Sequence, residues 1–330
     1  MRLRVFLNIL KRILSVTPIV WPFRPSGLYV FNYHRIGEPG LSDFDPNVFS
    51  CTTETFESHL FFLKNNFTVI SEDELLTIIE SKKAYNNKFA LITFDDGYID
   101  NYKLSYPLLL KYKLPASFFI ATDFILGNLI PWWDEIAFIL KACNPDHIKL
   151  PSIKKAFNLT NMPISCKTRE VLRQFKLLKN FSMNHKIAEL RDALDYHDQL
   201  SINQPLFMKW HQMLEMKANG MTFGSQTCSH KILSHLSNEE QKYEIAESKA
   251  ILETELNTKI NSIAYPVGGS CAYNQTTLKL VKQHGYKIGF SFIPGINQTI
   301  NNQFEFRRLP VANNASISRL KQQISRAILG

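Results

Sequence analysis

The sequence predicts an α/β protein built from parallel β/α units. Apolar runs typical of buried strands alternate with amphipathic helical stretches at short spacing, and capping boxes mark two helix starts. The 330 residues are 45% hydrophobic and 20% charged, which suits one large or two medium folded domains. This composition excludes disordered, collagen-like and low-complexity proteins.

The expected elements follow the chain in alternating order. Strands are predicted at 28–34, 67–70, 89–94, 116–121, 221–225, 261–265, 286–292 and 306–311. Helices are predicted at 55–65, 75–80, 102–112, 276–284 and in a long segment that ends at Leu256. Ser71-x-x-Glu74 and Ser237-x-x-Glu240 are the capping boxes, which indicate where the second and the long helix begin.

The alternation stops at Pro131–Glu135 and resumes at Met221. The intervening residues 136–218 have helical spacing and carry 13 Lys/Arg against 7 Asp/Glu, so we predict a helical subdomain inserted into the domain. Trp132 and Trp133 at its start either stack on sugar rings or anchor the insertion.

Residues 1–25 form a separate basic segment before the domain of residues 26–330. They hold five Lys/Arg and no acid, and apolar side chains recur at helical spacing from Leu3 to Leu14. We expect an amphipathic helix that lies on an anionic membrane surface or packs on the domain. A signal or anchor sequence is a third alternative, although Lys11-Arg12 interrupts the apolar run.

The cysteines and the hydropathy bear on location. Five scattered cysteines form no C-x-x-C pair, which favours a reducing compartment over a disulfide framework or a zinc ribbon. No apolar stretch approaches the roughly 20 residues of a membrane span. We therefore expect a cytoplasmic protein, peripheral at the inner face of the membrane if residues 1–25 bind lipid.

Adjacent carboxylates are the strongest local signal for chemistry. Asp95 and Asp96 follow the predicted strand 89–94, at the end of a parallel sheet where active sites gather. Because neighbouring side chains point in different directions, one carboxylate can bind a metal while the other acts as a base. An Asp-Gly turn without function is the alternative.

Two further strand ends carry candidate residues. His230 closes the segment 224–230, and a neutral imidazole is a natural metal ligand. The segment 264–269 ends in a Pro/Gly turn that can present a backbone N–H to developing negative charge. A lone histidine is more often structural, so His230 gains weight only beside Asp95 and Asp96, and the segment 264–269 alone is only a turn.

Together these segments resemble the polysaccharide deacetylase family, the NodB-like carbohydrate esterases. Thr93–Gly97 (TFDDG) matches the first family motif, Gly224–His230 resembles the second, and Ala264–Gly268 resembles the third. Order and spacing agree over residues 28–135 and 219–311. The opening Tyr33-His34-Arg35 and the Trp-Trp-Asp insertion are similar to a subgroup linked to surface polysaccharides. The resemblance implies a distorted (β/α) barrel with the site at its mouth.

The resemblance also implies a metal site. Asp96 would ligate a divalent ion, with zinc expected and cobalt or nickel as alternatives, and His230 would take the second place of the family's paired histidines. Gln226 stands where the family has the first histidine, and its neutral carbonyl is a weaker ligand for zinc-like ions. It would coordinate or hold a water, and His235 is a lower-ranked substitute.

The remaining roles implied by the resemblance are those of the proton carriers and their partners. Asp95 would be the general base, the Tyr265 backbone N–H would stabilise the oxyanion, and Arg308 would orient the base. The late histidine of the family is absent, because the last histidine of this chain is His284. By similarity to deacetylases of biofilm poly-N-acetylglucosamine, His34 would be the acid, with a buried structural histidine as the alternative.

The resulting function prediction is a metal-dependent de-N-acetylase acting on an N-acetylhexosamine in a surface polysaccharide or lipid-linked glycan. A non-catalytic carbohydrate-binding relative is the alternative, motivated by Gln226. A glycosidase fits poorly, because its two carboxylates must lie about 5–9 Å apart across the scissile bond. Nucleic acid is not an expected partner, since no recognised motif or aromatic-interleaved basic strand occurs.

Overall fold

The computed structural model describes residues 18–127, 129–153, 156–177, 182–198 and 205–329. They divide into two units. The barrel unit comprises the described parts of residues 1–37, 50–127 and 207–330, and the helical unit comprises those of 38–49 and 128–206. The predicted insertion at 136–218 overlaps the helical unit, but residues 207–218 belong to the barrel unit and residues 38–49 join the helical one.

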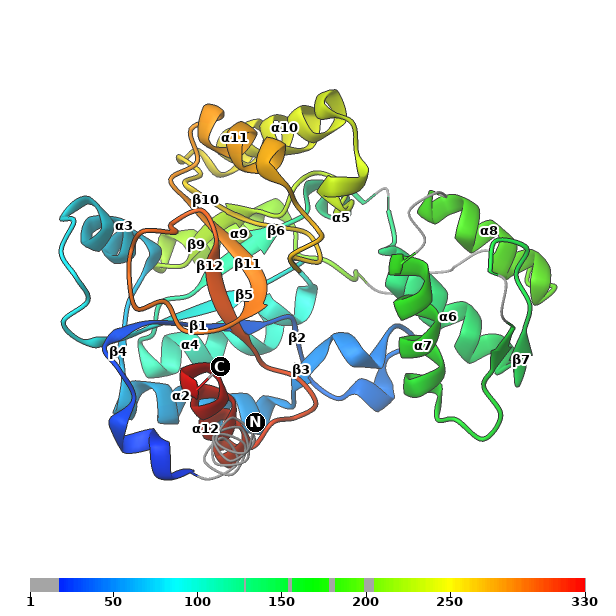
Figure 1. Ribbon diagram of the computed structural model, residues 1–330, viewed down its shortest axis with the longest axis horizontal. Helices are drawn as coiled ribbons and strands as arrows, with labels where there is room; N and C mark the ends of the chain where they lie inside the picture. Colours follow the sequence, from blue (N-terminus) through cyan, green and yellow to red (C-terminus); the bar gives the residue numbers. More distant parts are fainter. Residues whose placement is uncertain (1–17, 128, 154–155, 178–181, 199–204, 330) are drawn as a thin grey trace, which may run out of the picture. The chain divides into compact units, whose positions relative to one another are not determined.

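Within the described residues, seven parallel strands close into a barrel, which confirms the predicted fold class (Figure 1). They are β1 (Gly27–Tyr33), β5 (Lys88–Phe94), β6 (Ser117–Ile120), β9 (Thr222–Ser225), β10 (Ser262–Ala264), β11 (Ile288–Pro294) and β12 (Phe306–Pro310). The ring order is β1-β12-β11-β10-β9-β6-β5, and pairing of β1 with β5 closes it. The short strand β4 (Thr68–Val69) lies beside β5.

Helices occupy most of the connections between the barrel strands, as the alternation predicts, and one helix follows the last strand. They are α2 (Thr53–Asn66), α3 (Glu72–Glu80), the π-helical η4 (Asn101–Ser105), α4 (Tyr106–Tyr112), α5 (Thr122–Ile125), α9 (Trp210–Ala218), α10 (Asn238–Leu256), α11 (Gln275–Gln283) and α12 (Ile317–Leu329). Shorter elements are η1 (Pro18–Phe23), η5 (Leu233–His235) and the strand pair β2 (Arg35–Ile36) and β3 (Phe49–Cys51). Both predicted capping boxes are present at α3 and α10. The helices α5 and α12 are additions to the predicted set.

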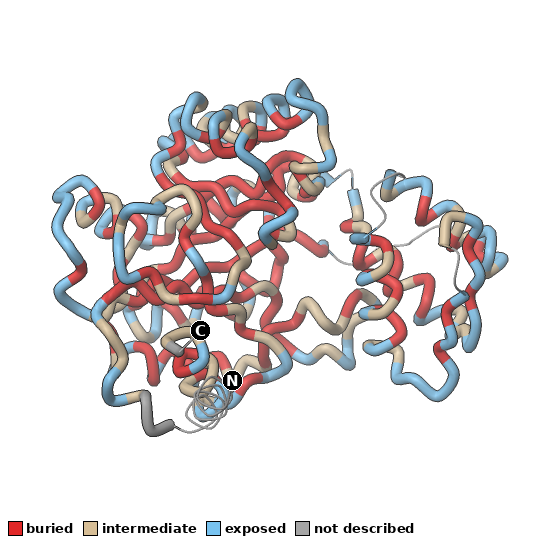
Figure 2. The backbone as a smooth tube through the Cα atoms, viewed as in Figure 1, coloured by how far each residue is buried: buried red, intermediate tan, exposed pale blue. Residues whose placement is uncertain are grey.

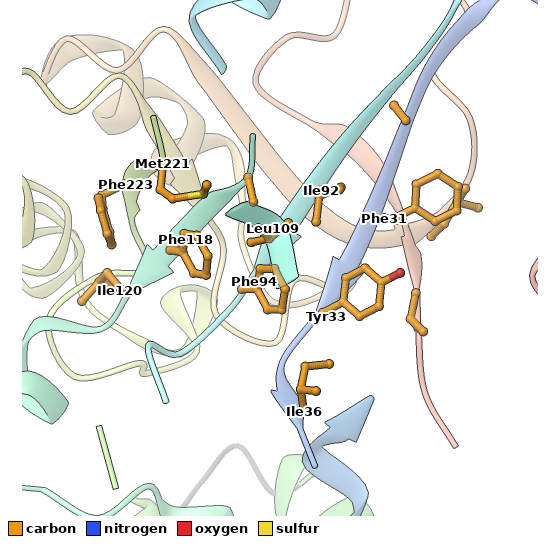
Figure 3. Close-up of a cluster of buried hydrophobic side chains, with 14 of the residues drawn as sticks. Phe31, Tyr33, Ile36, Ile92, Phe94, Leu109, Phe118, Ile120, Met221 and Phe223 are labelled. Atoms are coloured by element: carbon orange, nitrogen blue, oxygen red, sulfur yellow. The ribbon is translucent and has the colours of Figure 1, made fainter. Parts of the chain in front are cut away.

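Alternation along the strands separates an outer from an inner face of the barrel. Outward side chains such as Phe31, Phe94 and Phe118 pack with helix residues in one large buried cluster, part of which Figure 3 shows. The backbone of the barrel strands is correspondingly buried in Figure 2. Inward side chains, among them Leu91 and Phe290, form a second cluster. His34 and Asp95 directly follow β1 and β5, at positions where this alternation makes the side chains face the inside of the barrel.

The helix α3 closes the end of the barrel where the strands begin. Its Leu75 and Ile79 join the inward cluster, and Glu72 accepts a hydrogen bond of 2.7 Å from Ser262 at the start of β10. Further along, Gly224 of β9 faces the Phe119 ring so closely that an added Cβ would lie 2.5 Å from it. The interior is therefore filled by side chains, and the opposite strand ends are left to carry the site.

The helical unit has a small core of its own. Its helices are α6 (Trp132–Cys143), α7 (Ile164–Leu177) and α8 (Met183–Ala193), with the pair β7 (His147–Ile148) and β8 (Phe157–Asn158) and the turns η2 (Pro39–Leu41) and η3 (Pro46–Val48). Trp133 is buried, and the buried Asp134 accepts the backbone N–H of Asp45 at 2.9 Å. Trp133 therefore anchors this unit, in line with one of its two predicted roles.

The basic segment at residues 1–25 is only partly described. The helix predicted around Leu3–Leu14 lies outside the described residues. After it, Trp21 packs on Phe62 with ring centroids 5.2 Å apart, and Arg24 donates a 2.9 Å hydrogen bond to the Asn66 carbonyl. Residues 18–25 thus belong to the barrel packing. Across the described part of the chain, no helix combines the length and apolar character of a membrane span.

Candidate active site

The strand register brings the predicted residues to one end of the barrel. Tyr33 of β1 pairs with Phe94 of β5, so His34 and Asp95 leave their strands at the same level. Ser225, the residue before Gln226, pairs with β6 and β10. Parallel strands present their carboxyl ends at one mouth, which explains why residues distant in sequence meet there.

Asp95 is buried and held by Arg308 across the barrel. The guanidinium donates two hydrogen bonds, Nη1 to Oδ1 at 2.7 Å and Nη2 to Oδ2 at 2.8 Å, while its Nε donates to the Ser291 carbonyl. Burial alone raises the pKa of Asp95, but Arg308, His34 and Asn32 together bring it below its ordinary value. Asp95 is therefore an ionised carboxylate that Arg308 holds in one orientation, while its predicted role as the base stays a prediction.

His34 lies beside Asp95 and remains open to solvent. Its Nε2 is 3.8 Å from Asp95 Oδ2, and 24% of its side chain is exposed against 2% for Asp95. Its backbone is held on both sides, because its N–H donates to Ser50 Oγ and its carbonyl accepts from Asn101 Nδ2 at 2.7 Å. The exposure does not match a histidine enclosed in the core, so the geometry favours the functional alternative.

Next to Asp95, the structure brings together Asp96, His230 and Gln226. His230 Nε2 lies 3.4 Å from Asp96 Oδ1, and both residues are buried. Gln226 Oε1 accepts the Asp96 N–H at 2.7 Å, and Gln226 Nε2 lies 3.2 Å from His230 Nε2. The Gln226 amide therefore has its oxygen on the Asp96 N–H and its nitrogen beside the His230 ring. This orientation does not match the prediction that the Gln226 carbonyl is a metal ligand.

Asp96 and His230 carry the carboxylate and imidazole donors that divalent metal ions accept, and Asp96 Oδ1 lies 3.4 Å from His230 Nε2. Among the described residues, no group of three or more His, Cys, Asp or Glu side chains is suited to a metal. His235 is exposed in η5 and does not join the pair.

The predicted oxyanion role of Tyr265 is corrected by the structure. Its backbone N–H donates to the Phe290 carbonyl at 3.0 Å, so the barrel sheet already uses it. Its side chain belongs to the outer buried cluster, stacks on Tyr273 and donates to the Phe304 carbonyl. Tyr265 is therefore a packing residue.

The turn after Tyr265 offers a different N–H. The Gly268 N–H donates to the Pro266 carbonyl, which places Val267 in the middle of a three-residue turn at a φ of 61°. No described residue accepts a hydrogen bond from the Val267 N–H. A β-branched residue at positive φ is strained, and such strain concentrates at functional sites.

Sequence reasoning missed several residues that shape the site. Asp100 accepts from Arg35 Nε at 2.8 Å and from the Ile36 N–H at 2.9 Å, which fixes the chain just after His34. Phe124 of α5 stacks on the His230 ring with centroids 6.1 Å apart. Asp100 lies only four residues after Asp96, but nothing in its local pattern indicates the distant partner that it holds.

The structure thus places one held carboxylate, one partly exposed imidazole and a carboxylate–imidazole pair at the mouth of a parallel barrel, and these groups are able to accept and donate protons. Residues 82–289 match the model of the polysaccharide deacetylase family. YxkH of Bacillus subtilis (strain 168), whose name assigns it to the same deacetylases, is 24% identical over 294 residues, which are 89% of this chain and 74% of YxkH.

Two solved structures share the fold. The deacetylase PplD of Streptococcus pyogenes, in complex with acetate, has a TM-score of 0.59 and 22% identity, over 91% of this chain and 99% of PplD. IcaB of Ammonifex degensii has a TM-score of 0.57 and 16% identity, over 92% and 98% of the two chains. The chain belongs to the polysaccharide deacetylase family, and it is a hydrolase of the de-N-acetylase class.

Proposed function

We propose that this protein removes the N-acetyl group from an N-acetylhexosamine in a surface polysaccharide or a lipid-linked glycan, with a divalent metal ion. The observation that carries the proposal is the pairing of two sets at one barrel mouth. One set is Asp95 held by Arg308 beside His34, and the other is Asp96 facing His230. Amide hydrolysis needs a base, an acid and an electrophile, and these sets supply the side chains for all three.

Asp96 and His230 would hold the metal, which we take to be zinc, with cobalt or nickel as alternatives. When bound, such an ion acts as a Lewis acid toward a carbonyl oxygen and water. Gln226 would bind no metal itself; its hydrogen bond from the Asp96 N–H would keep the Asp96 carboxylate facing His230. This assignment replaces the ligand role that the sequence suggested for Gln226.

Asp95 would take the proton from the attacking water. Both of its oxygens accept from Arg308, which leaves each oxygen a further lone pair for a proton. His34 would give a proton to the leaving amine, because it is the more exposed of the two residues and lies where a glycan can approach. The Val267 N–H would donate to the oxyanion in place of Tyr265.

The test is acetate release from N-acetylglucosamine oligosaccharides with added Zn²⁺ or Co²⁺. Asp95→Asn should lower kcat by about 10²–10⁴-fold and leave metal binding intact, because the base does not ligate. Asp96→Asn should lose the metal in calorimetric titration. The number of reducing ends should stay constant, which separates deacetylation from glycosidic cleavage. Sugar binding without metal-dependent acetate release would instead support the carbohydrate-binding alternative.

The substrate's location is the finer part of the proposal. The basic, acid-free residues 1–25 would bring the enzyme to an anionic membrane, where a lipid-linked glycan is presented. The barrel unit after residue 25, at residues 26–37, 50–127 and 207–330, holds 22 basic and 18 acidic residues. This excess of +4 does not by itself indicate a polyanionic glycan.

A further inference from the structure

The segment that carries His230 has an unfavourable backbone. Thr227 and His230 both have positive φ values, of 66° and 54°. Such a conformation is costly for any residue with a Cβ, and most of all for a β-branched threonine. The segment 227–230 therefore needs support from outside to keep this shape.

Helix α10 supplies support from one side, through two residues one turn apart. The buried Glu244 accepts with Oε2 from the Cys228 and Ser229 N–H groups, both at 2.9 Å, and with Oε1 from the Ser229 hydroxyl. Ser248 lies 2.7 Å from Ser225 Oγ, which accepts the Thr227 N–H at 3.0 Å. One helix face thus accepts the N–H groups of Cys228 and Ser229 directly, and it reaches the Thr227 N–H only through Ser225.

Helix α5 binds the same segment from another side. The Thr122 N–H donates to the Thr227 carbonyl at 3.2 Å, and the Asp123 N–H donates to the Cys228 carbonyl at 3.0 Å. The segment is held through its N–H groups by α10 and through its carbonyls by α5. His230, the next residue, then emerges in a fixed direction, with its Nε2 3.4 Å from Asp96 Oδ1.

Glu244 has no comparable partner elsewhere. Among the described residues it forms no salt bridge, and the start of α10 is capped by Ser237 and Glu240 instead. A buried carboxylate without a cation is stable only when hydrogen bonds replace its hydration. The three donors on Cys228 and Ser229 fill this need, so the carboxylate and the segment stabilise each other.

We infer that Glu244 is a positioning residue, which holds Cys228 and Ser229 by hydrogen bonds and so directs His230 toward Asp96. The inference rests on the proposed function, in which His230 is a metal ligand. Only then does the direction of the His230 ring affect metal binding. Glu244 itself touches neither Asp96 nor His230. Its effect is therefore on the direction of the imidazole, and through it on metal affinity.

The experiment compares three variants of the full chain. Glu244→Leu removes all acceptors, and Glu244→Gln keeps an amide oxygen for the two N–H groups while its amide nitrogen can donate to Ser229 Oγ. Glu247→Leu, at an exposed position of the same helix, is the control. The readouts are Zn²⁺ titration of the metal-free protein by calorimetry and the ring signals of His230 in histidine-labelled protein by NMR.

We expect Glu244→Leu to weaken Zn²⁺ binding about tenfold and to shift the His230 ring signals. Glu244→Gln should weaken Zn²⁺ binding less than threefold, and Glu247→Leu should bind Zn²⁺ like the wild type. If Glu244→Leu weakens Zn²⁺ binding less than threefold and leaves the His230 signals unshifted, this result overturns the inference. So does a Glu244→Gln variant as impaired as Glu244→Leu, because hydrogen-bond acceptance is then not the cause.

If thermal unfolding shows that Glu244→Leu does not fold, Glu244→Asp takes its place. The Asp side chain is one methylene shorter, so its carboxylate would lie farther from the Cys228 and Ser229 donors. If the wild type binds no Zn²⁺, the proposed function fails, and the His230 ring signals of the metal-free variants still test the positioning role.

Discussion

At the scale of single residues, Asp95 shows how a buried group stays ionised. Burial opposes its charge, and the charge and hydrogen bonds of Arg308, together with His34 and Asn32, outweigh that penalty. The carboxylate is then a base already in its active form at neutral pH. Its lowered pKa makes it a weaker proton acceptor than an ordinary carboxylate, so its effectiveness rests on position and on the acidity of the water that it meets.

Arg308→Gln tests this balance. Without the guanidinium charge, burial dominates, and the pKa of Asp95 should rise. A carboxylate with a higher pKa is protonated at higher pH, so the acid limb of the kcat/KM profile should move to higher pH. The measurement is acetate release between pH 4 and 9.

The control for this prediction is Arg307→Gln, one residue earlier and exposed. It should leave the acid limb in place. An Arg308→Gln profile that coincides with the control would show that Arg308 does not set the ionisation of Asp95.

At the scale of elements, polar groups lie at both ends of the barrel, at the beginnings of the strands and at their ends. Glu72 in the first turn of α3 is buried, and it hydrogen-bonds with Ser262 of β10 and Ser117 of β6. Burial raises the pKa of Glu72 to about 7, only partly offset by these serines. This end of the barrel therefore has a titrating group that takes no part in the proposed chemistry.

Glu72→Gln should make the protein less sensitive to alkaline pH. The pKa of Glu72 is higher in the folded than in the unfolded chain, so its contribution to stability is full below about pH 4.5 and is lost as pH rises through about 7. The wild type thus loses up to about 3 kcal/mol that Gln, which does not ionise, retains.

The measurement is urea unfolding of both proteins from pH 4.5 to 8.5. The free energy of unfolding of Glu72→Gln relative to the wild type should increase with pH. A difference that stays constant over this range would contradict the raised pKa. Glu80→Gln, at an exposed position of the same helix, is the control.

At the scale of the whole molecule, the net charge of +9 is unevenly distributed. Residues 1–25 contribute +5 (5 − 0), residues 136–218 contribute +6 (13 − 7), and the remainder contributes −2 (20 − 22). Grouped by structural unit, the helical unit is neutral (11 − 11), the barrel unit after residue 25 carries +4 (22 − 18), and residues 1–25 carry +5 (5 − 0). The densest positive charge therefore lies in residues 1–25, and such a segment favours attraction of the chain to an anionic surface.

Deletion of residues 1–17 should reduce binding to vesicles that contain anionic phosphatidylglycerol. Residues 18–25 are kept, because Trp21 and Arg24 pack on the barrel. Four basic side chains are lost, each worth about 1 kcal/mol near such a surface. Co-sedimentation with anionic and with neutral vesicles measures the effect.

A matched variant changes only charge. Replacing Arg2, Arg4, Lys11 and Arg12 by Gln keeps the apolar residues and should weaken binding nearly as much as the deletion. Vesicle binding that is the same for the deleted and the full chain would mean that this segment has no role at the membrane.

Much of the fold could be predicted because its signals are local. The strand 89–94 and its Asp95-Asp96 end are contiguous, and the capping boxes at Ser71 and Ser237 need only four residues each. The C-terminal boundary of the insertion was harder to predict from the sequence, because α9 has the same helical spacing as the helices before it. Only its packing assigns it to the barrel unit.

The sequence by itself determined the α/β class, the strand ends that bear Asp95, Asp96 and His230, and their order along the chain. The tertiary structure alone decided the hydrogen bonds. Arg308 donates to Asp95, which lies 213 residues away in the sequence, and the Gln226 oxygen accepts the Asp96 N–H. The Tyr265 N–H donates to the Phe290 carbonyl. The physical reason is that periodicity and capping depend on neighbours in the chain. A hydrogen-bond partner in a closed barrel depends on register and closure, which bring together residues that no local pattern connects.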